Sequence, residues 1–354
     1  MPPKPPKSPK SPKSSKPDAA GRPSPVTSYD VARRARVAQS TVSRAFNADS
    51  SMSEATRKRI LAAARKLGYR PNAIARSLVT RRSNLVAIII SNLTNLFYPE
   101  VLSELSQRFS ARGVRVLLFT LPRESDIDLA LEQVWQYRVD GVVAAARLSS
   151  SQVEEFELHQ LPLVFFNRYP PDREVNAVCC DQLKGARELV SRLYAAGHKR
   201  YAIISGPVDS VVSEERVRGA LTCLKELKLA APLVVDGDYG YDGGARALHK
   251  IMERSSGAPD AIICANDLLA IGCMDAARHD YGLRVPEALS IVGFDGVDPS
   301  RWQSYRLTTL RQPVSLMAAA AVSMLMDRID DGRLPMEIRV FAGDILDRGS
   351  ARLG

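Results

Sequence analysis

Cysteine and histidine are scarce in this chain, and the few that occur are scattered. Among 354 residues there are five cysteines and four histidines, with no CxxC pair and no metal-ligand spacing. We therefore expect no metal site, no cofactor and reduced thiols, as in a cytoplasmic protein associated with the nucleoid. The cysteines are Cys179, Cys180, Cys223, Cys264 and Cys273.

Long apolar runs and the common catalytic motifs are missing as well. No stretch reaches the ~18 apolar residues of a membrane span, and no apolar segment follows the basic start as it would in a secretory signal. GxxxxGK[ST], GxGxxG, GxSxG and HExxH do not occur. These absences argue against a membrane protein and against an enzyme, although aspartates at strand ends keep an enzyme open as an alternative.

Acidic residues are rare at the front of the chain. Residues 1–85 carry 19 Lys and Arg against 4 Asp and Glu, whereas the remainder carries 30 against 35. A cationic leading segment on a mildly acidic body is typical of a nucleic-acid-binding module joined to another domain. The alternative is a solvated basic face with a charged tail.

The first 25 residues consist almost entirely of Pro, Lys, Ser and small residues. Such a composition buries too little apolar surface to become ordered, so we expect a disordered tail. Ser-Pro-Lys occurs at residues 8–10 and again at 11–13. This arm either lies along DNA, adding salt-dependent affinity, or serves as an inert linker.

Three short helical patterns follow the tail. Thr27 and Asp30 form a capping box that predicts a helix over residues 28–35. The stretch VAQSTVSRAFN then places apolar residues four apart, which predicts a second short helix. Ser53 caps a third helix, and Gly68 ends it. Three such helices with a tight turn between the first two indicate a helix-turn-helix, although an ordinary three-helix bundle has the same periodicity.

The second helix carries polar side chains of several lengths on one face. Gln39, Ser40 and Arg44 suit base edges in the major groove, and the planar fork of Arg44 matches guanine. Shorter groups suit phosphates. They are Thr27, Thr41, Ser43 and Asn47.

VTSYDVARRARVAQSTVSRAFN, followed by SEATRKRILAAARKLGYRPNAIARSL, closely resembles the DNA-binding headpiece and hinge of the lactose-repressor (LacI/GalR) family of bacterial transcription factors. The resemblance covers residues 26–80 and continues more weakly through the rest. It implies base-reading positions on the second helix, a hinge helix over residues 71–79, and a leucine, Leu78, that wedges into the minor groove. Without it, Leu78 is only an apolar linker residue. The predicted DNA-binding residues are Thr27, Gln39, Ser40, Thr41, Ser43, Arg44, Asn47, Ser53, Asn72, Ala75 and Leu78.

Two positions depart from the family pattern. Arg36 stands where a glycine is usual in the turn, and Ala38 stands where a serine usually caps the second helix. A positive φ at Arg36 costs of order 1 kcal/mol, and a missing cap costs about as much again. Because Arg36 and Ala38 lie just before Gln39 and Ser40, a changed turn shifts the position of these two side chains relative to the bases.

From residue 85 onward, short apolar runs alternate with helical patterns. Continuous apolar strands separated by helices indicate parallel sheets covered on both faces, and their number favours two doubly wound sheets. The runs lie at residues 86–90, 114–119, 141–146, 163–166, 177–180, 201–205, 261–264 and 290–294.

Polar residues follow five of these runs, at the edge of a parallel sheet where ligands bind. They are Ser91 and Asn92, Asn167 and Arg168, Gly206 and Ser210, Asn266 and Asp267, and Asp295.

The segments HKRYAIISGP, SEERVRGA, ANDLLAIG and IVGFDGVD resemble the regulatory core of the same family, which is similar to periplasmic sugar-binding proteins. By that resemblance Arg216, Asn266 and Asp295 fall on effector-binding positions, with chemistry that suits a polyol. Alternatively, Arg216 pairs with Glu214 or Glu215. Phe97, Tyr239 and Trp302 are candidate platforms for a ring, and Trp302 is alternatively plain core. The predicted effector-binding residues are Ser91, Phe97, Tyr98, Asn167, Ser210, Arg216, Tyr239, Asn266, Asp295 and Trp302.

The predicted architecture is an N-terminal all-α helix-turn-helix headpiece followed by an α/β periplasmic-binding-protein-like core of two doubly wound subdomains. Its predicted function is that of a repressor whose operator affinity a sugar or sugar acid controls, acting as a homodimer; the alternative is an α/β sugar-binding protein or enzyme without a DNA role. An Ala- and Met-rich helix over residues 313–330 is either core or dimer surface. The expected divisions are a tail (1–25), a DNA-binding domain (26–70), a hinge and linker (71–84) and a core (85–354), whose N-subdomain takes residues 85–180 and 312–338 and whose C-subdomain takes 181–311 and 339–354.

Overall fold

The computed structural model describes residues 26–46, 51–70, 82–91, 93–121, 126–254 and 257–354. The chain divides into two compact units, residues 1–79 and residues 80–354. Among the described residues no helix combines the length and the apolar character that crossing a membrane requires.

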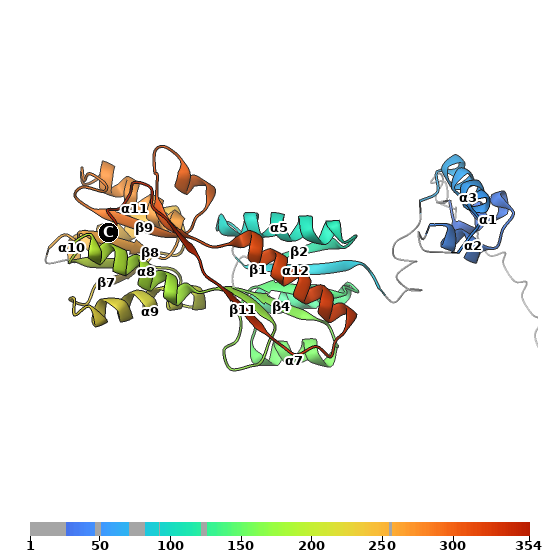
Figure 1. Ribbon diagram of the computed structural model, residues 1–354, viewed down its shortest axis with the longest axis horizontal. Helices are drawn as coiled ribbons and strands as arrows, with labels where there is room; N and C mark the ends of the chain where they lie inside the picture. Colours follow the sequence, from blue (N-terminus) through green and yellow to red (C-terminus); the bar gives the residue numbers. More distant parts are fainter. Residues whose placement is uncertain (1–25, 47–50, 71–81, 92, 122–125, 255–256) are drawn as a thin grey trace, which may run out of the picture. The chain divides into compact units, whose positions relative to one another are not determined.

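The first unit is a three-helix domain (Figure 1) made of α1 (Ser28–Ala35), α2 (Gln39–Ala45) and α3 (Glu54–Leu67). Its small core is built from one apolar face of each helix, with Val31, Val42 and Ile60 fully buried. The predicted capping box is confirmed, because the Asp30 carboxylate accepts hydrogen bonds from the backbone N–H of Thr27 at 3.0 Å and from its hydroxyl at 2.7 Å.

Both departures from the family pattern are visible in the turn between α1 and α2. Arg36 adopts φ 53° and ψ 52°, the left-handed conformation that glycine adopts without strain. Ala38 occupies the N-cap of α2 and supplies no side-chain hydrogen bond. The turn is therefore made with two residues that fit it poorly.

The second unit contains two six-stranded sheets, ordered β11-β5-β4-β3-β1-β2 and β12-β10-β9-β8-β6-β7. Neighbouring strands run parallel, apart from the antiparallel pair β10 and β12. The strands are β1 (Leu85–Ser91), β2 (Arg115–Leu121), β3 (Gly141–Ala145), β4 (Leu163–Phe166), β5 (Ala177–Cys180), β6 (Tyr201–Ser205), β7 (Leu233–Asp236), β8 (Ala261–Cys264), β9 (Ser290–Asp295), β10 (Thr308–Arg311), β11 (Ile338–Phe341) and β12 (Asp344–Leu346).

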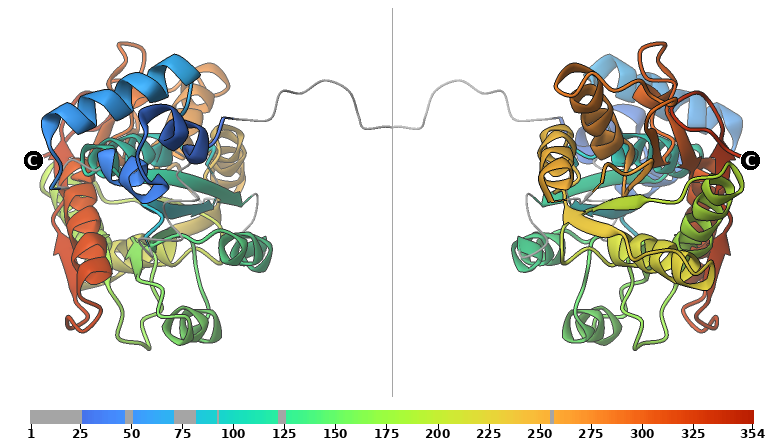
Figure 2. Two further views of the ribbon diagram at one scale, coloured as in Figure 1. Left: turned by 90° about the vertical axis from the view of Figure 1, so that its right-hand side faces the viewer. Right: turned by 90° about the vertical axis from the view of Figure 1, so that its left-hand side faces the viewer.

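Helices cover both faces of each sheet (Figure 2). In β1, Ile88 and Ile90 face one apolar cluster while Ala87 and Ile89 face another, which explains why this strand reads as an unbroken apolar run. The helices are α5 (Phe97–Ala111), α6 (Ile127–Gln136), α7 (Ser150–Leu158), α8 (Gln182–Ala195), α9 (Val211–Glu226), α10 (Tyr241–Arg254), α11 (Asp267–His279) and α12 (Val314–Asp330), with a 3-10 turn η2 (Asp298–Arg301).

The chain passes between the two sheets three times: after β5, between β10 and α12, and between β11 and β12. We call the sheet that contains β1 and its helices the first lobe, and the sheet that contains β9 the second lobe. The crossing expected near residue 338 comes too early, because β11 pairs with β5 in the first lobe and only the chain beyond Phe341 joins the second. Residues 339–341 therefore belong with the first lobe.

Helix α12 packs on the first lobe beside α5. Met317, Ala318, Ala321 and Leu325 are buried there, so the core interpretation of this Ala- and Met-rich segment is confirmed for that face. Leu316 lies on the other face and is largely exposed.

Candidate functional site

Two sets of predicted site residues lie in separate units of the chain. In the first unit, Gln39, Ser40, Ser43 and Arg44 are exposed on α2, and Thr41 is half-buried. Buried Val42 holds the opposite face of α2 in the core. The helix therefore presents a polar surface with one cation to solvent, as direct readout of base edges requires.

Several of these side chains are held in place within the domain. The Gln39 side-chain amide donates to the Ser28 hydroxyl at 3.1 Å, which ties the start of α2 to α1. A guanidinium nitrogen of Arg44 lies 3.5 Å from the Thr41 hydroxyl. Tyr29, which the sequence did not single out, is 67% exposed on the first turn of α1.

Two predicted DNA-binding residues have roles within the fold. The Thr27 hydroxyl is engaged by Asp30, and the two hydrogen bonds from Thr27 lower the pKa of the Asp30 carboxyl. The Ser53 hydroxyl accepts from the backbone N–H of Thr56 at 3.4 Å and so caps α3. Asn47, Asn72, Ala75, Leu78 and Asn92, together with the tail and the hinge segment 71–79, lie outside the described residues.

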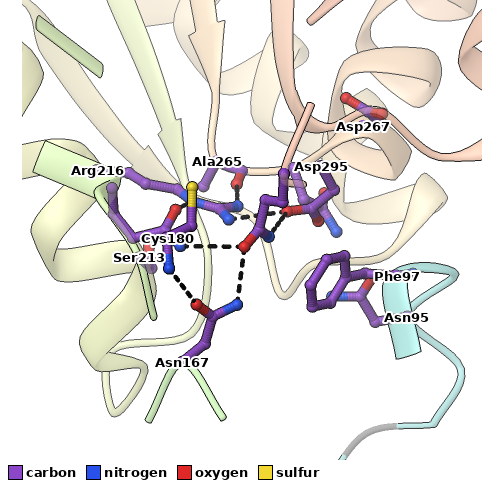
Figure 3. Close-up of polar contacts among 12 residues, drawn as sticks. Asn95, Phe97, Asn167, Cys180, Ser213, Arg216, Ala265, Asp267 and Asp295 are labelled. Carbon is purple, nitrogen blue, oxygen red and sulfur yellow. Dashed lines mark hydrogen bonds and ion pairs between the residues drawn. The ribbon is translucent and has the colours of Figure 1, made fainter. Parts of the chain in front are cut away.

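The core holds a small buried cavity where the two lobes meet the crossing segments. Its volume is about 10 Å³, close to the space of a single water molecule. Figure 3 shows Arg216, Asp295 and Asn167 converging on it, with Phe97 on the far side. The lining consists of Asn95, Phe97, Tyr98, Asn167, Arg168, Val212, Arg216, Tyr239, Asp295 and Gln312.

Arg216 is the most heavily bonded of these side chains. Its Nη2 donates to Asp295 Oδ1 at 2.8 Å, its Nε to Gln182 Oε1 at 2.8 Å, and its Nη1 to the carbonyl of Ala265. Burial opposes the charge, but the Asp295 carboxylate keeps the pKa of Arg216 above its ordinary value. The alternative pairing with Glu214 or Glu215 is wrong, since Arg216 turns inward to Asp295.

Gln312 connects Asp295 to the first lobe. It lies between β10 and α12, on the second crossing, and its Nε2 donates to Asp295 Oδ1 at 2.8 Å. Its Oε1 accepts from Asn167 Nδ2 at 2.8 Å and from Gln182 Nε2 at 3.3 Å. Asn167 in turn accepts from the backbone N–H of Cys180 at 2.8 Å. Around the cavity these polar groups therefore bond one another.

Backbone strain occurs at three residues that line this cavity. Asn167, Tyr239 and Asp295 have φ of 63°, 65° and 105°, values that residues with a Cβ rarely adopt. Strain of this kind is retained where the surrounding structure over-determines it, and such positions cluster at binding sites. Gly206 lies against the Tyr239 ring, so any side chain at that position would overlap it.

Three predicted effector-binding residues stand one layer behind the lining. The Ser91 hydroxyl accepts from Arg168 Nη1 at 2.9 Å, and the hydroxyls of Ser210 and Tyr239 lie 2.8 Å apart. Asn266 caps α11 and donates to the carbonyl of Tyr239 at 3.0 Å. Their role is to orient lining residues.

Trp302 does not line the cavity and is not plain core either. It follows η2 and is 54% exposed. The prediction that it forms a platform within this cavity is therefore wrong. Phe97 and Tyr98 do line it, with their ring centroids 5.5 Å apart and the rings packed edge-to-face.

Sequence reasoning missed Gln182 and Gln312. Both belong to segments where the chain crosses between the lobes, and no apolar run in the sequence marks such a segment.

Asp267 lies beyond Asp295 (Figure 3) and is fully buried. Its carboxylate accepts from the backbone N–H of Val297 at 2.8 Å and from the Thr309 hydroxyl at 2.5 Å. Burial, and then the nearby charge of Asp295, raise the pKa of Asp267 to about 8. This acid therefore changes charge near neutral pH.

The cysteines offer no comparable chemistry. All five are buried and unbridged, and burial raises the pKa of Cys179 and of Cys180 to about 12, so both thiols stay protonated at neutral pH. Within the described residues, no group of three or more His, Cys, Asp or Glu is placed to hold a metal ion.

Comparison with known proteins agrees with this geometry. Residues 27–72 match the model of bacterial regulatory proteins of the lacI family, and residues 190–351 match a periplasmic binding protein-like domain. Catabolite control protein A of Priestia megaterium is 32% identical over 305 residues, which span 85% of this chain and 91% of that protein. The chain belongs to the lacI family.

Solved structures of other lacI-family members share the fold of this one. A lac repressor dimer bound to operator and to the anti-inducer ONPF superimposes with a TM-score of 0.84, at 26% identity over 92% of this chain and 99% of that one. The complex of the transcriptional regulator CelR with cellobiose gives a TM-score of 0.70, at 29% identity over 93% and 100%. The predicted fold class is thus confirmed, and so is the function of the chain as a DNA-binding transcriptional regulator.

Proposed function

We propose that this lacI-family regulator is a dimeric repressor that reads operator DNA with Gln39, Ser40 and Arg44 of α2 and binds a sugar between its lobes. The assignment of the effector site rests on one continuous series of hydrogen bonds, which runs from Arg216 through Asp295 and Gln312 to Asn167. Charged and amide groups of this kind pair with the hydroxyls of a polyol. Such a ligand replaces the internal bonds one for one.

The same chain explains how binding is coupled to DNA affinity. Asn167 belongs to the first lobe, Asp295 to the second, and Gln312 to a crossing between them. A ligand that takes over the hydrogen bonds of Asn167 or Asp295 breaks this buried link between the lobes. A change in the angle between the lobes then alters the spacing of the two hinge segments in a dimer, and with it operator affinity. The proposed domain divisions are those given above, except that residues 339–341 lie in the first lobe.

We also propose that the cavity binds its ligand without converting it. Its polar groups hydrogen-bond one another, and the same groups suit recognition of hydroxyls. The lac repressor and CelR structures, to which this chain is similar, are those of regulators. Because its partner is DNA, we also propose that the protein acts in the compartment that holds the chromosome. Prolonged incubation with a bound sugar should return that sugar unchanged by mass spectrometry, and any product would contradict this part of the proposal.

The function is tested with full-length protein and duplexes enriched from a genomic fragment library. We expect the wild type to prefer an enriched duplex over a scrambled one at moderate salt, and a sugar to change that affinity. Arg216→Ala should keep operator affinity within about twofold but lose the response to sugar. Operator should change sugar affinity by the same factor as sugar changes operator affinity.

The matched control is Arg192→Ala, which removes an exposed arginine paired with Glu188 on α8. This variant should respond to sugar as the wild type does. Failure of the wild type to prefer any duplex, with or without sugars, would overturn the DNA-binding role. An unchanged response in Arg216→Ala would overturn the effector site alone.

A further inference from the structure

A second, larger hollow is lined, like the cavity, by residues of both lobes. Its volume is about 700 Å³, against about 10 Å³ for the cavity. Adjacent residues line the two spaces: Arg168 and Val212 face the cavity, whereas Tyr169 and Val211 line the hollow. We call this hollow the outer chamber. The outer chamber thus neighbours the effector site along the chain and offers far more room than the cavity.

One wall of the outer chamber is apolar and includes an aromatic ring. Tyr169, in the loop that follows β4, is half-buried because it packs on the apolar cluster of the first lobe. Leu148, Pro170 and Pro171 continue this wall, and Val211 adds to it from the second lobe. A flat ring with apolar neighbours is the surface on which the face of a sugar ring stacks, since that face exposes C–H groups.

The charged lining of the outer chamber is mainly acidic. Asp172, Asp209, Glu214 and Glu215 line it, against the two guanidinium groups of Arg147 and Arg218. Carboxylates only accept hydrogen bonds, so the lining favours a group rich in hydroxyl donors. Burial already raises the pKa of Glu215, which means that a further negative charge beside it is unfavourable.

We propose that the effector is a neutral saccharide of at least two rings: the lobes part to admit one ring at the inner cavity, and the next ring stacks on Tyr169 in the outer chamber. The inference rests on the proposed function and adds size and charge to it. A lone monosaccharide leaves the outer chamber to water. A sugar phosphate or nucleotide with its charged group in the outer chamber meets an excess of carboxylates. Stacking on one aromatic ring contributes about tenfold in affinity.

The experiment is a calorimetric titration of full-length protein with matched sugars. Cellobiose, maltose, lactose and xylobiose are compared with glucose, galactose and xylose, and with glucose 6-phosphate and galactose 6-phosphate. We expect at least one disaccharide to bind about tenfold more tightly than each of its component rings. Neither phosphate should bind more tightly than its parent sugar.

Variants of Tyr169 then locate the second ring. Tyr169→Ala should remove the disaccharide advantage and leave the affinity for the single ring unchanged, whereas Tyr169→Phe keeps the ring and so keeps the advantage. Tyr137→Ala, which removes an exposed tyrosine of the same lobe that lies outside the chamber, should change neither affinity.

The outcomes separate this inference from the function on which it rests. If a monosaccharide or a sugar phosphate binds as tightly as any disaccharide, the two-ring proposal is overturned while the effector site stands. If Tyr169→Ala weakens single-ring and two-ring sugars equally, the second ring does not lie on Tyr169 and the proposal fails. If no sugar in the set binds wild-type protein, the sugar class itself is wrong.

Discussion

The side-chain amide of Asn167 donates to the side-chain carbonyl of Gln312 across 2.8 Å, which joins the first lobe to the segment that crosses into the second. Gln312 is 1% exposed, and its own amide donates to Asp295. The two residues thus share one buried chain of hydrogen bonds through the centre of the core. Removing the Gln312 side chain therefore takes one hydrogen-bond partner from Asn167 and one from Asp295.

We expect Gln312→Ala to destabilise the core by about 1–3 kcal/mol, because a buried polar group that loses its partner keeps its desolvation penalty. The measurement is the free energy of unfolding from urea denaturation. Gln136→Ala, at an exposed position at the end of α6, is the control and should change that free energy little. Equal effects of the two substitutions would show that the chain through Gln312 does not stabilise the fold.

Asp267 predicts how stability depends on pH. Its pKa is about 8 in the folded protein against an ordinary value of 3.8, so between these pH values the folded state binds a proton that the unfolded state has lost. Stability from this group is therefore fully present below pH ~4 and is lost as pH rises through ~8. Denaturation of the wild type between pH 5 and 9 should show this fall.

Asp267→Asn is the variant that checks the assignment. Its amide resembles the protonated acid and can still meet the Val297 N–H and the Thr309 hydroxyl. We expect the fall in stability between pH 5 and 9 to be much smaller in this variant. Asp236→Asn serves as control. It replaces an exposed carboxylate, which accepts a hydrogen bond from the Ser205 hydroxyl. A wild-type slope in Asp267→Asn would place the titrating group elsewhere.

Most strands were predictable because parallel strands are buried on both faces. Ile88, Ile89 and Ile90 are all fully buried, and such a run needs no tertiary information to be recognised. Four strands were missed: β7, β11 and β12 are largely exposed or half-buried, whereas β10 is buried but begins with two threonines. In β11 exposed and half-buried residues alternate, and Val340 is 59% exposed, so its pairing with β5 depends on a long-range crossing.

The candidate site was predictable only in part, for a related reason. Asn167 and Asp295 follow apolar strands, so the strand pattern pointed to them, and Arg216 was named by resemblance. Gln312 follows β10, whose sequence TTLR gives no strong strand signal. Trp302 was misplaced because a large aromatic near a strand end suggests a platform, while the turn η2 in fact carries it to the surface.

Arg36 offers a stabilising change in the first unit. With φ at 53° its side chain strains the turn, and glycine adopts this conformation without a penalty. Arg36→Gly should stabilise the three-helix domain by about 1 kcal/mol, measured by hydrogen exchange of its amides within the full chain. Arg34→Gly, inside α1, should destabilise the domain by a similar amount. Slower exchange in both variants, or in neither, would contradict the assignment of strain to Arg36.

Arg44 is the residue on which sequence discrimination should depend most. It is exposed on α2, and its planar fork matches the two acceptors of guanine in the major groove. Arg44→Ala should reduce the preference for an enriched operator over a scrambled duplex by about 1–3 kcal/mol. Competition binding at fixed salt measures this preference.

The control is Arg33→Ala on α1, an exposed arginine that lies 3.6 Å from Asp30. If Arg33 acts only through its charge, its loss weakens operator and scrambled duplexes alike and leaves the preference between them intact. The two variants therefore separate base reading from general attraction to phosphates, since both remove one positive charge. Discrimination that survives in Arg44→Ala but is lost in Arg33→Ala would assign the readout to α1 and overturn the role of α2.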